Sequence, residues 1–225
     1  MREIVLDTET TGLDPRTGDR LVEIGCVELV NHVPTGRTYH TYINPERGMP
    51  EGAFAVHGLS EAFLAAHPVF AEVADAFLQF IDDATLVIHN ASFDLGFINA
   101  ELERLGRGAV EPGRAIDTVQ LARSKYPGAQ ASLDALCRRF EIDLSVRTKH
   151  GALLDAELLA DVYLELIGGR QPGFELGSRR GASGAAMIES SRAPARPARP
   201  HAPGEAEIAA HEAFLGRLTD PIWRD

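Results

Sequence analysis

Three stretches near the start of the chain have the hydrophobic patterns of β-strands. A buried run begins at Ile4, and residues 21–30 and 36–43 follow with mostly apolar or alternating positions. Short turns join these stretches, so they are predicted to form an antiparallel meander. Residues 45–52 are rich in proline and glycine, which predicts a loop.

Hydrophobic side chains spaced three and four positions apart predict helices in the rest of the body. Two of these helices are expected over residues 70–81 and 152–167. Four others are expected to begin near residues 60, 90, 117 and 132. Asn90, Asp117 and Ser132 stand where N-cap side chains are expected. Short apolar runs at 85–89 and 115–116 predict further strands. The fold class is therefore α/β, a mixed sheet flanked by helices.

Two carboxylates follow the first buried run of the chain. Asp7 and Glu9 are two positions apart, so in an extended chain both point to the same face. Residues 4–12 contain no Lys or Arg that could compensate them, and burying two like charges together is costly. A divalent cation bound by both carboxylates is one explanation, because hard cations prefer oxygen ligands. A solvated strand end is the alternative at this point.

Two further acidic residues occupy first turns of predicted helices. Asp94 precedes Phe97 and Ile98 by three and four positions, so it leans toward the apolar face. Favourable interaction with the helix dipole is the alternative explanation for Asp94. Asp155 shares one helical stripe with apolar residues, and a buried carboxylate needs a partner such as a metal. His150 is expected on the loop that leads into the same helix.

Strand ends and first helical turns can meet at one edge of a mixed sheet. Four carboxylates gathered there would balance two Mg²⁺ ions, which would let an anionic phosphodiester approach an acidic protein. Two such metals clamp the attacking and leaving oxygens of a phosphoryl displacement. A neutral histidine beside them can take a proton from water, because its pKa lies near the operating pH.

The net charge of −11 limits how the chain could meet nucleic acid. Residues 1–167 hold 14 Lys and Arg against 26 Asp and Glu, which gives −12; residues 168–204 give +4 and residues 205–225 give −3. An acidic body argues against tight autonomous binding to nucleic acid. Two cysteines without metal spacing, no secretory signal and no membrane-length apolar run predict a cytoplasmic protein.

The composition changes beyond Ile167. Residues 177–204 are rich in Gly, Ala, Ser, Arg and Pro, which predicts a flexible linker. Residues 205–218 regain a helical pattern, and Trp223 follows near the end. Such a segment is expected to fold on a partner. The predicted division is therefore a domain over 1–167, a linker over 168–204 and a binding segment over 205–225.

Three ordered motifs carry a specific resemblance. Asp7-Thr8-Glu9, the segment Asn90-Ala91-Ser92-Phe93-Asp94 and the segment His150-Gly151-Ala152-Leu153-Leu154-Asp155 resemble the motifs of the DEDDh family of 3′–5′ exonucleases. The resemblance implies a ribonuclease H-like fold and two divalent metal ions, Mg²⁺ or Mn²⁺. Asp7, Glu9 and Asp155 would hold the first metal, and Asp7 with Asp94 the second. His150 would be the general base.

The resemblance also implies a pocket for the 3′-terminal nucleotides. Its lining would comprise Thr10, Val56, His57, His89, Asn90 and Phe93. Core packing is an equal explanation for Val56 and Phe93. For His57 and His89 the pocket is favoured, because both follow apolar runs and precede turns.

Two partner segments are implied in the same way. Residues 171–176 stand where the family carries a hexapeptide that binds the sliding clamp, although an ordinary linker explains them almost equally well. Residues 205–225 resemble a segment that binds the alpha subunit of DNA polymerase III. The expected function is then removal of mispaired 3′-terminal nucleotides from DNA as 5′-monophosphates. A 3′ exoribonuclease and a catalytically silent subunit that steadies the polymerase are the alternatives.

Overall fold

A computed structural model describes residues 1–145, 149–169 and 203–218. The chain divides into two units, Met1–Glu175 and Leu176–Asp225. The hexapeptide at 171–176 and Trp223 lie outside the described residues. No helix in the described part is long and apolar enough to cross a membrane.

The first unit is built on a mixed sheet of five strands in the order β3-β2-β1-β4-β5. The strands are β1 (Arg2–Thr10), β2 (Leu21–Val30), β3 (Val33–Tyr42), β4 (Thr85–Ile88) and β5 (Ala115–Asp117). The first three form the predicted antiparallel meander, and β4 and β5 continue the sheet in parallel with β1. The strand β1 does not end before the carboxylates, since it runs through both of them to Thr10.

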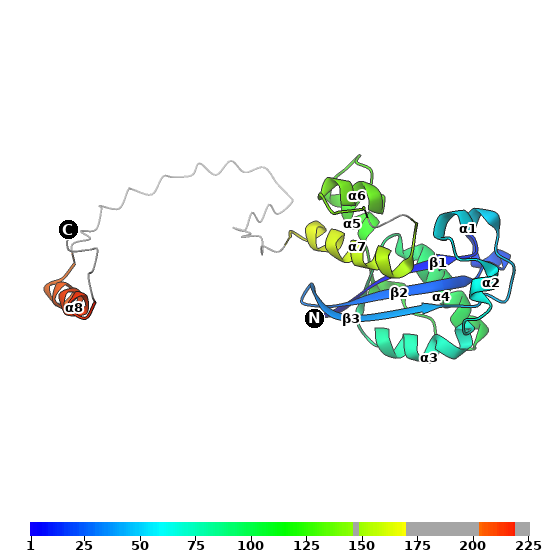
Figure 1. Cartoon of the computed structure of the whole chain (residues 1–225), viewed down its shortest axis with the longest axis horizontal. Helices are drawn as coiled ribbons and strands as arrows, with labels where there is room; N and C mark the ends of the chain where they lie inside the picture. Colours follow the sequence, from blue (N-terminus) through cyan, green and yellow to red (C-terminus); the bar gives the residue numbers. More distant parts are fainter. Residues whose placement is uncertain (146–148, 170–202, 219–225) are drawn as a thin grey trace, which may run out of the picture. The chain divides into compact units, whose positions relative to one another are not determined.

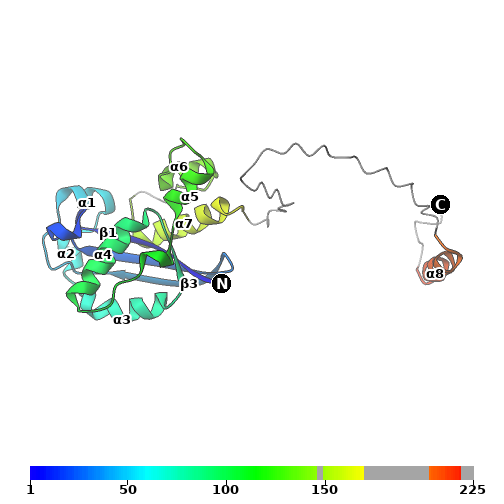
Figure 2. The ribbon, with the colours of Figure 1, turned by 180° about the vertical axis from the view of Figure 1, so that it is seen from behind.

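Helices cover both faces of this sheet, as Figures 1 and 2 show from opposite sides. One face carries α3 (Phe70–Ile81) and α4 (Ala91–Arg104), and the other carries α5 (Thr118–Lys125), α6 (Leu133–Arg139) and α7 (Ala152–Leu166). The alternation of β1 supplies both cores: Ile4 and Leu6 pack with α3 and α4, whereas Val5 packs with α7. The mixed sheet flanked by helices confirms the predicted fold class.

The helix α1 (Glu51–His57) begins inside the segment predicted to be a loop, whereas α2 (Glu61–Leu64) starts as expected after its Ser60 cap. The pattern could not reveal α1, because His57 is its only buried residue and no apolar stripe exists. Its N-cap is Pro50, which makes no side-chain hydrogen bond. Short 3₁₀ turns at Pro15–Thr17 (η1) and Pro112–Arg114 (η2) complete the described elements of this unit.

The predicted helix caps have two outcomes. The side chains of Asp117 and Ser132 accept backbone N–H hydrogen bonds at the starts of α5 and α6, as predicted. Asn90 also occupies an N-cap position, but its backbone is left-handed (φ 67°) and its side chain makes no capping bond. The backbone N–H of Asn90 donates a hydrogen bond to Asp117 Oδ1, which ties the start of α4 to the end of β5.

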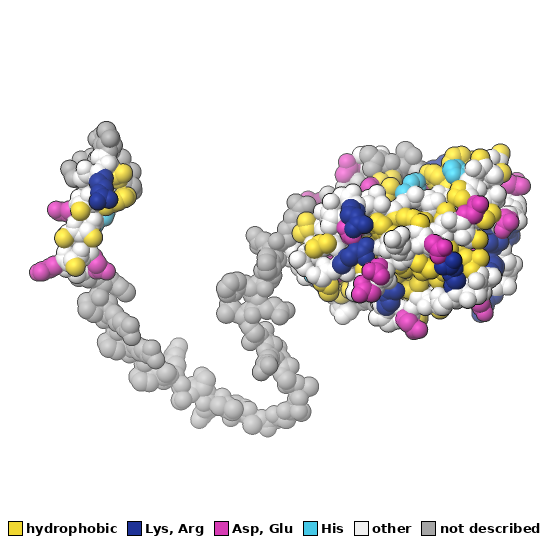
Figure 3. All heavy atoms as spheres, turned by 90° about the horizontal axis from the view of Figure 1, so that it is seen from below, with side chains coloured by type: hydrophobic (Ala, Val, Ile, Leu, Met, Phe, Trp, Pro, Cys, Tyr) yellow, Lys and Arg dark blue, Asp and Glu magenta, His cyan; other side chains and the backbone are white. Residues whose placement is uncertain are grey.

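The second unit contains the predicted C-terminal helix, α8 (Glu205–Leu215). Ile208 and Phe214 are exposed on it, and hydrophobic side chains lie among its acidic ones in Figure 3. Leu218, just after the helix, is also exposed. A helix that leaves such side chains in solvent has an apolar surface available for a partner.

Candidate active site

The site begins where β1 extends beyond the end of its parallel neighbour, β4. The last residue of β4, Ile88, pairs with Leu6, whereas β1 continues for four more residues to Thr10. The other edge of this extension remains paired with β2. A cleft therefore opens beyond the carboxyl end of β4, where the chain turns into α4. Ligands of open α/β sheets commonly bind outside the carboxyl ends of the strands.

The pleat of β1 sends successive side chains of this extension to opposite faces. Asp7 and Glu9 lie on the face of Val5, toward α7, and Thr8 lies toward α4. Thr8 Oγ1 donates a hydrogen bond of 2.7 Å to Asp94 Oδ1. This bond joins α4 to β1 and brings a third carboxylate to the cleft.

The fourth carboxylate reaches the cleft because α7 packs against the backbone of β2. A Cβ atom on Gly25 would lie 2.2 Å from the backbone carbon of Ala152, so only glycine permits this contact. Gly25 is the β2 partner of Asp7. The first turn of α7, which carries Asp155, is thereby held beside Asp7. A glycine inside a strand, as at Gly25, is a sequence signal for such a close approach of another backbone.

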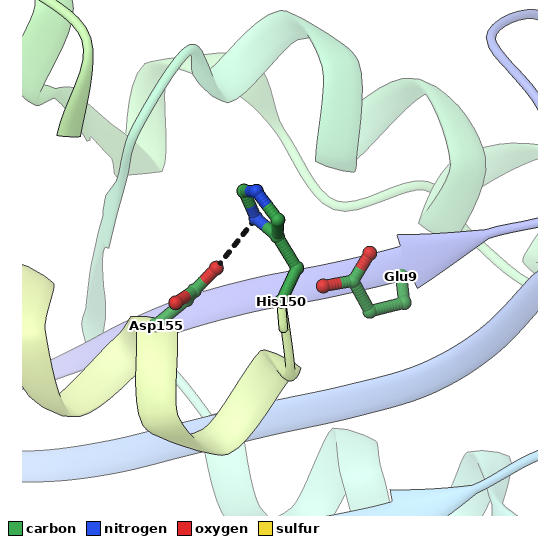
Figure 4. Close-up of side chains that lie close together, drawn as sticks. All are labelled: Glu9, His150 and Asp155. Carbon is green, nitrogen blue, oxygen red and sulfur yellow. Dashed lines mark hydrogen bonds and ion pairs between the residues drawn. The ribbon is translucent and has the colours of Figure 1, made fainter. Parts of the chain in front are cut away.

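His150 stands on the loop before α7, as predicted. Its Nδ1 lies 3.1 Å from Asp155 Oδ2, and Figure 4 shows the two side chains facing each other with Glu9 nearby. Its backbone N–H donates to the carbonyl of Val56, so α1 helps to fix the loop. The side chain is 48% exposed. Asp155 therefore orients an imidazole that remains open to solvent and to a substrate.

All five residues predicted to be catalytic line one cleft of about 320 Å³. Potential ligand atoms of Glu9, His150 and Asp155 lie within 4.8 Å of one another. The start of α6 forms a wall that the sequence analysis did not assign to the site. The full lining is Asp7, Thr8, Glu9, His89, Phe93, Asp94, Ser132, Leu133, Asp134, His150 and Asp155.

Burial of Asp94 in this cleft disfavours its charged form. Burial raises the pKa of Asp94 to about 7, although the hydrogen bond from Thr8 acts in the opposite direction. Its charged form is therefore disfavoured unless a positive charge approaches. Carboxylate oxygens and one imidazole are suitable ligands for a divalent cation. The residues present thus fit the metal ions that were expected.

Two of the residues predicted to bind substrate, His89 and Phe93, line the cleft. His89 Nδ1 lies 2.9 Å from Thr118 Oγ1, and Thr118 is fully buried under it. Burial lowers the pKa of His89, which favours the neutral ring. Thr118 was not predicted to serve the site, because a buried threonine in a first helical turn gives no distinctive signal.

The other four residues predicted to bind substrate lie outside the cleft lining, and their roles stay predictions. Thr10 Oγ1 donates to the carbonyl of Gly12, and Val56 is exposed on α1. The buried ring of His57 accepts the N–H of Leu59 at Nδ1, and burial lowers its pKa. Asn90 stands at the turn into α4 described above.

A family model and curated relatives both assign the chain to one protein family. Residues 4–163 match the family model of RNase T, described as exonuclease. The chain is 57% identical over 179 residues to a DNA polymerase III subunit epsilon of Rickettsia felis, covering 78% of each chain. It is 45% identical over 223 residues to that of Escherichia coli K12, covering 95% of this chain and 92% of the relative. The chain belongs to this exonuclease family.

Solved structures agree with the fold. Exonuclease X in complex with 5′ overhanging duplex DNA is 26% identical with a TM-score of 0.58, covering 73% of this chain and 90% of that one. The nuclease domain of 3′hExo, a DEDDh family member bound to rAMP, is 16% identical with a TM-score of 0.65, covering 74% and 91%. The fold is the ribonuclease H-like exonuclease fold, and this family member is a 3′–5′ exonuclease.

Proposed function

We propose that this exonuclease is the proofreading subunit of a replicative DNA polymerase, removing mispaired 3′-terminal nucleotides as 5′-monophosphates. The observation that carries the proposal is the convergence of four carboxylates and His150 in one cleft beyond the end of β4. Relatives named DNA polymerase III subunit epsilon support the choice of DNA over other polymers.

The size of the cleft supports action on a strand end. Its volume of about 320 Å³ lies at the lower limit of ordinary ligand sites, roughly 300 to 1,000 Å³, and helices of both sheet faces wall it. A terminal nucleotide can enter only after it leaves its partner strand. A mispaired end separates at lower cost than a paired one, so the enzyme selects mismatches without reading bases.

The residues at the site divide into those that would hold metal ions and one that would accept a proton. Asp7, Glu9 and Asp155 would hold one Mg²⁺ or Mn²⁺, and Asp7 with Asp94 a second. When bound, the two ions lower the pKa of water and stabilise charge on the attacking and leaving oxygens. Asp94 would enter this site as the anion, since a cation opposes the effect of burial on its pKa.

His150 would act as the general base. Its exposed ring takes one proton from the attacking water while the water oxygen forms a bond to phosphorus. The bond between phosphorus and the 3′ oxygen of the preceding nucleotide breaks, and that oxygen gains a proton from solvent. The contact with Asp155 keeps the imidazole in the cleft through this exchange.

The C-terminal part would join the nuclease to its polymerase in the cytoplasm. Residues 205–225 would bind the alpha subunit of DNA polymerase III, and the exposed apolar side chains of Ile208 and Phe214 on α8 support this role. Residues 171–176 would bind the sliding clamp. The acidic body explains the need for such tethers, because phosphate contacts supply much of the affinity for DNA.

Mismatch excision tests the proposal directly. A DNA primer with a mispaired 3′ end is incubated with wild type or with His150→Ala, in Mg²⁺ or in EDTA. We expect stepwise, Mg²⁺-dependent loss of 3′ nucleotides, weakened by roughly a hundredfold or more in the variant, because general base catalysis contributes that much. Faster cleavage of a matched RNA oligomer would favour the exoribonuclease, and no cleavage by folded protein would favour the silent subunit.

A further inference from the structure

A shallow groove on α6 has an excess of positive charge on a strongly acidic body. Its described lining is Ala129, Gln130, Ala135, Arg138 and Arg139, and its volume is about 520 Å³. No acidic side chain is among these lining residues. We call it the α6 groove.

The arginines of the α6 groove differ from most others of the first unit in how their charge is balanced. Arg2 and Arg37 pair with Glu28, Arg20 and Arg104 pair with Glu101, and Arg107 pairs with Asp75. Each of these pairs brings an arginine nitrogen to a carboxylate oxygen. Figure 3 shows basic and acidic side chains next to one another on the face of α3.

No described residue forms a hydrogen bond or ion pair with Arg138, which is exposed. The guanidinium of Arg139 lies 4.5 Å from the ring centre of Tyr126, so an aromatic ring and not a described carboxylate is its partner. Two neighbouring positive charges therefore remain available to an anion.

The helix α6 connects the α6 groove to the catalytic cleft. Ser132, Leu133 and Asp134 at its beginning line the cleft, and Ala135, Arg138 and Arg139 further along line the groove. Six residues separate Ser132 from Arg138, which is roughly 9 Å along a helix axis at 1.5 Å per residue. Phosphates along one strand of a duplex rise about 3.4 Å each, and an unpaired strand is more extended, so this distance corresponds to at most about three nucleotides.

We infer that the α6 groove binds the phosphodiester backbone of the substrate strand within about three nucleotides of the bond that is cleaved. Continuity with the cleft favours this strand over an acidic protein partner. Arg138 and Arg139 supply phosphate contacts, and the Arg139–Tyr126 pair adds a flat surface on which a base can stack. The inference rests on the proposed function, since it requires a nucleic acid end in the cleft.

Substrate length separates this contact from catalysis. The full chain and the variant Arg138→Gln/Arg139→Gln are compared on a DNA dinucleotide, which fills only the cleft, and on a single-stranded DNA decamer. We expect the KM for the decamer to rise roughly tenfold at low salt, because charge-assisted bonds to phosphate are lost. We expect kcat on both substrates and the KM for the dinucleotide to stay unchanged.

The salt dependence of decamer binding provides a second readout. Losing two phosphate contacts reduces the slope of log affinity against log salt by roughly 1.4 for a single strand. Arg37→Gln is the matched control, since it removes an exposed arginine on β3 that Glu28 already balances. We expect that control to leave the slope and both KM values unchanged.

The outcomes distinguish this inference from the proposed function. If wild type cleaves both DNA substrates and the double variant keeps the wild-type KM and salt slope, the α6 groove does not bind the strand. An equal loss on dinucleotide and decamer also overturns the inference, because it indicates damage to the cleft. If folded wild type cleaves neither substrate, the proposed function fails and this inference fails with it.

Discussion

Two regions of the molecule compensate the free-energy cost of burying a carboxylate in different ways. Glu101 on α4 is buried and lies 2.5 Å from Arg20 and 2.9 Å from Arg104. Asp94, two turns earlier on the same helix, is equally buried but has the hydroxyl of Thr8 as its side-chain partner. Glu101 has cationic partners that balance its charge. Asp94 has no cationic hydrogen-bond partner among the described residues, and burial raises its pKa to about 7.

We propose that this difference separates the acids that serve the fold from those that serve the chemistry. Glu28 follows the pattern of Glu101: Arg2 binds it, and its pKa is lowered mainly by that hydrogen bond. The acids of the cleft gather with one another around His150. A protein that buries carboxylates in this way gives up stability in the metal-free state and gains a site for cations.

Gly25→Ala should have the largest effect, because it separates the acids of the cleft. The added methyl group meets the backbone of α7 at 2.2 Å, so the helix must move and carry Asp155 with it. We expect unfolding free energy to fall by about 3 kcal/mol, the upper range for overpacking. Exonuclease activity should fall about a hundredfold through misplacement. Urea denaturation and excision assays measure the two effects.

Gly96→Ala is the matched control for this prediction. A Cβ atom on Gly96 meets no other atom within 4 Å, and alanine favours the helix α4. This variant should keep full activity and equal or slightly higher stability. Wild-type activity in a folded Gly25→Ala protein would disprove the role given to the contact between β2 and α7.

Arg20→Gln tests the structural acid. It removes one of two arginines from buried Glu101, and Arg104 compensates only in part. We expect unfolding free energy to fall by about 2 kcal/mol, less than the loss of a whole buried pair. Adding Glu101→Gln should recover part of this loss, because no buried charge then remains. Arg16→Gln is the control, because Arg16 belongs to an exposed ion pair, and its unfolding free energy should equal that of wild type. Equal stability of Arg20→Gln and Arg16→Gln would contradict the structural role given to the pairing of Glu101.

Asp94→Asn should change stability with the opposite sign, and only in part of the pH range. In EDTA, the native pKa of about 7 exceeds the unfolded value near 3.9, so the native state binds the extra proton between them. Wild-type stability is therefore lost as pH rises from about 4 through 7. The asparagine variant, which has no charge there, should therefore be more stable than wild type at pH 8 and unchanged below pH 4. Thermal melts across this pH range measure the difference; a variant less stable at pH 8 would refute it.

The sequence predicted the elements whose hydrophobic period is strong. The strand at Leu21–Val30 and the helix at Phe70–Ile81 have the predicted bounds, and the stripe on α7 correctly placed Asp155 in the interior. Periodicity failed for α1, which buries only His57. It also could not find Arg20 and Glu101, because 81 residues separate them and spacing carries no information about such a pair.

For the candidate site too, local sequence pattern predicted positions along the chain but not long-range contacts. Motifs placed five residues on the right strand end, loop and helical turns, but not the contacts that support them. Gly25 and Thr118 act through close approach and burial in the folded chain, and these depend on which element packs opposite. Such partners are fixed by tertiary structure and not by local pattern.

Binding of Mn²⁺ to metal-free protein tests the central claim, that the cleft acids form a cation site and the arginine-paired acids do not. Thermal melts of wild type, Asp7→Asn and Glu28→Gln are recorded in EDTA and in saturating Mn²⁺. A ligand at a hundred times its Kd contributes about 2.7 kcal/mol, or roughly 5 to 10 °C in Tm for a chain of this size. We predict that increase for wild type and for Glu28→Gln, and almost none for Asp7→Asn. The same increase in Asp7→Asn as in wild type would contradict the account.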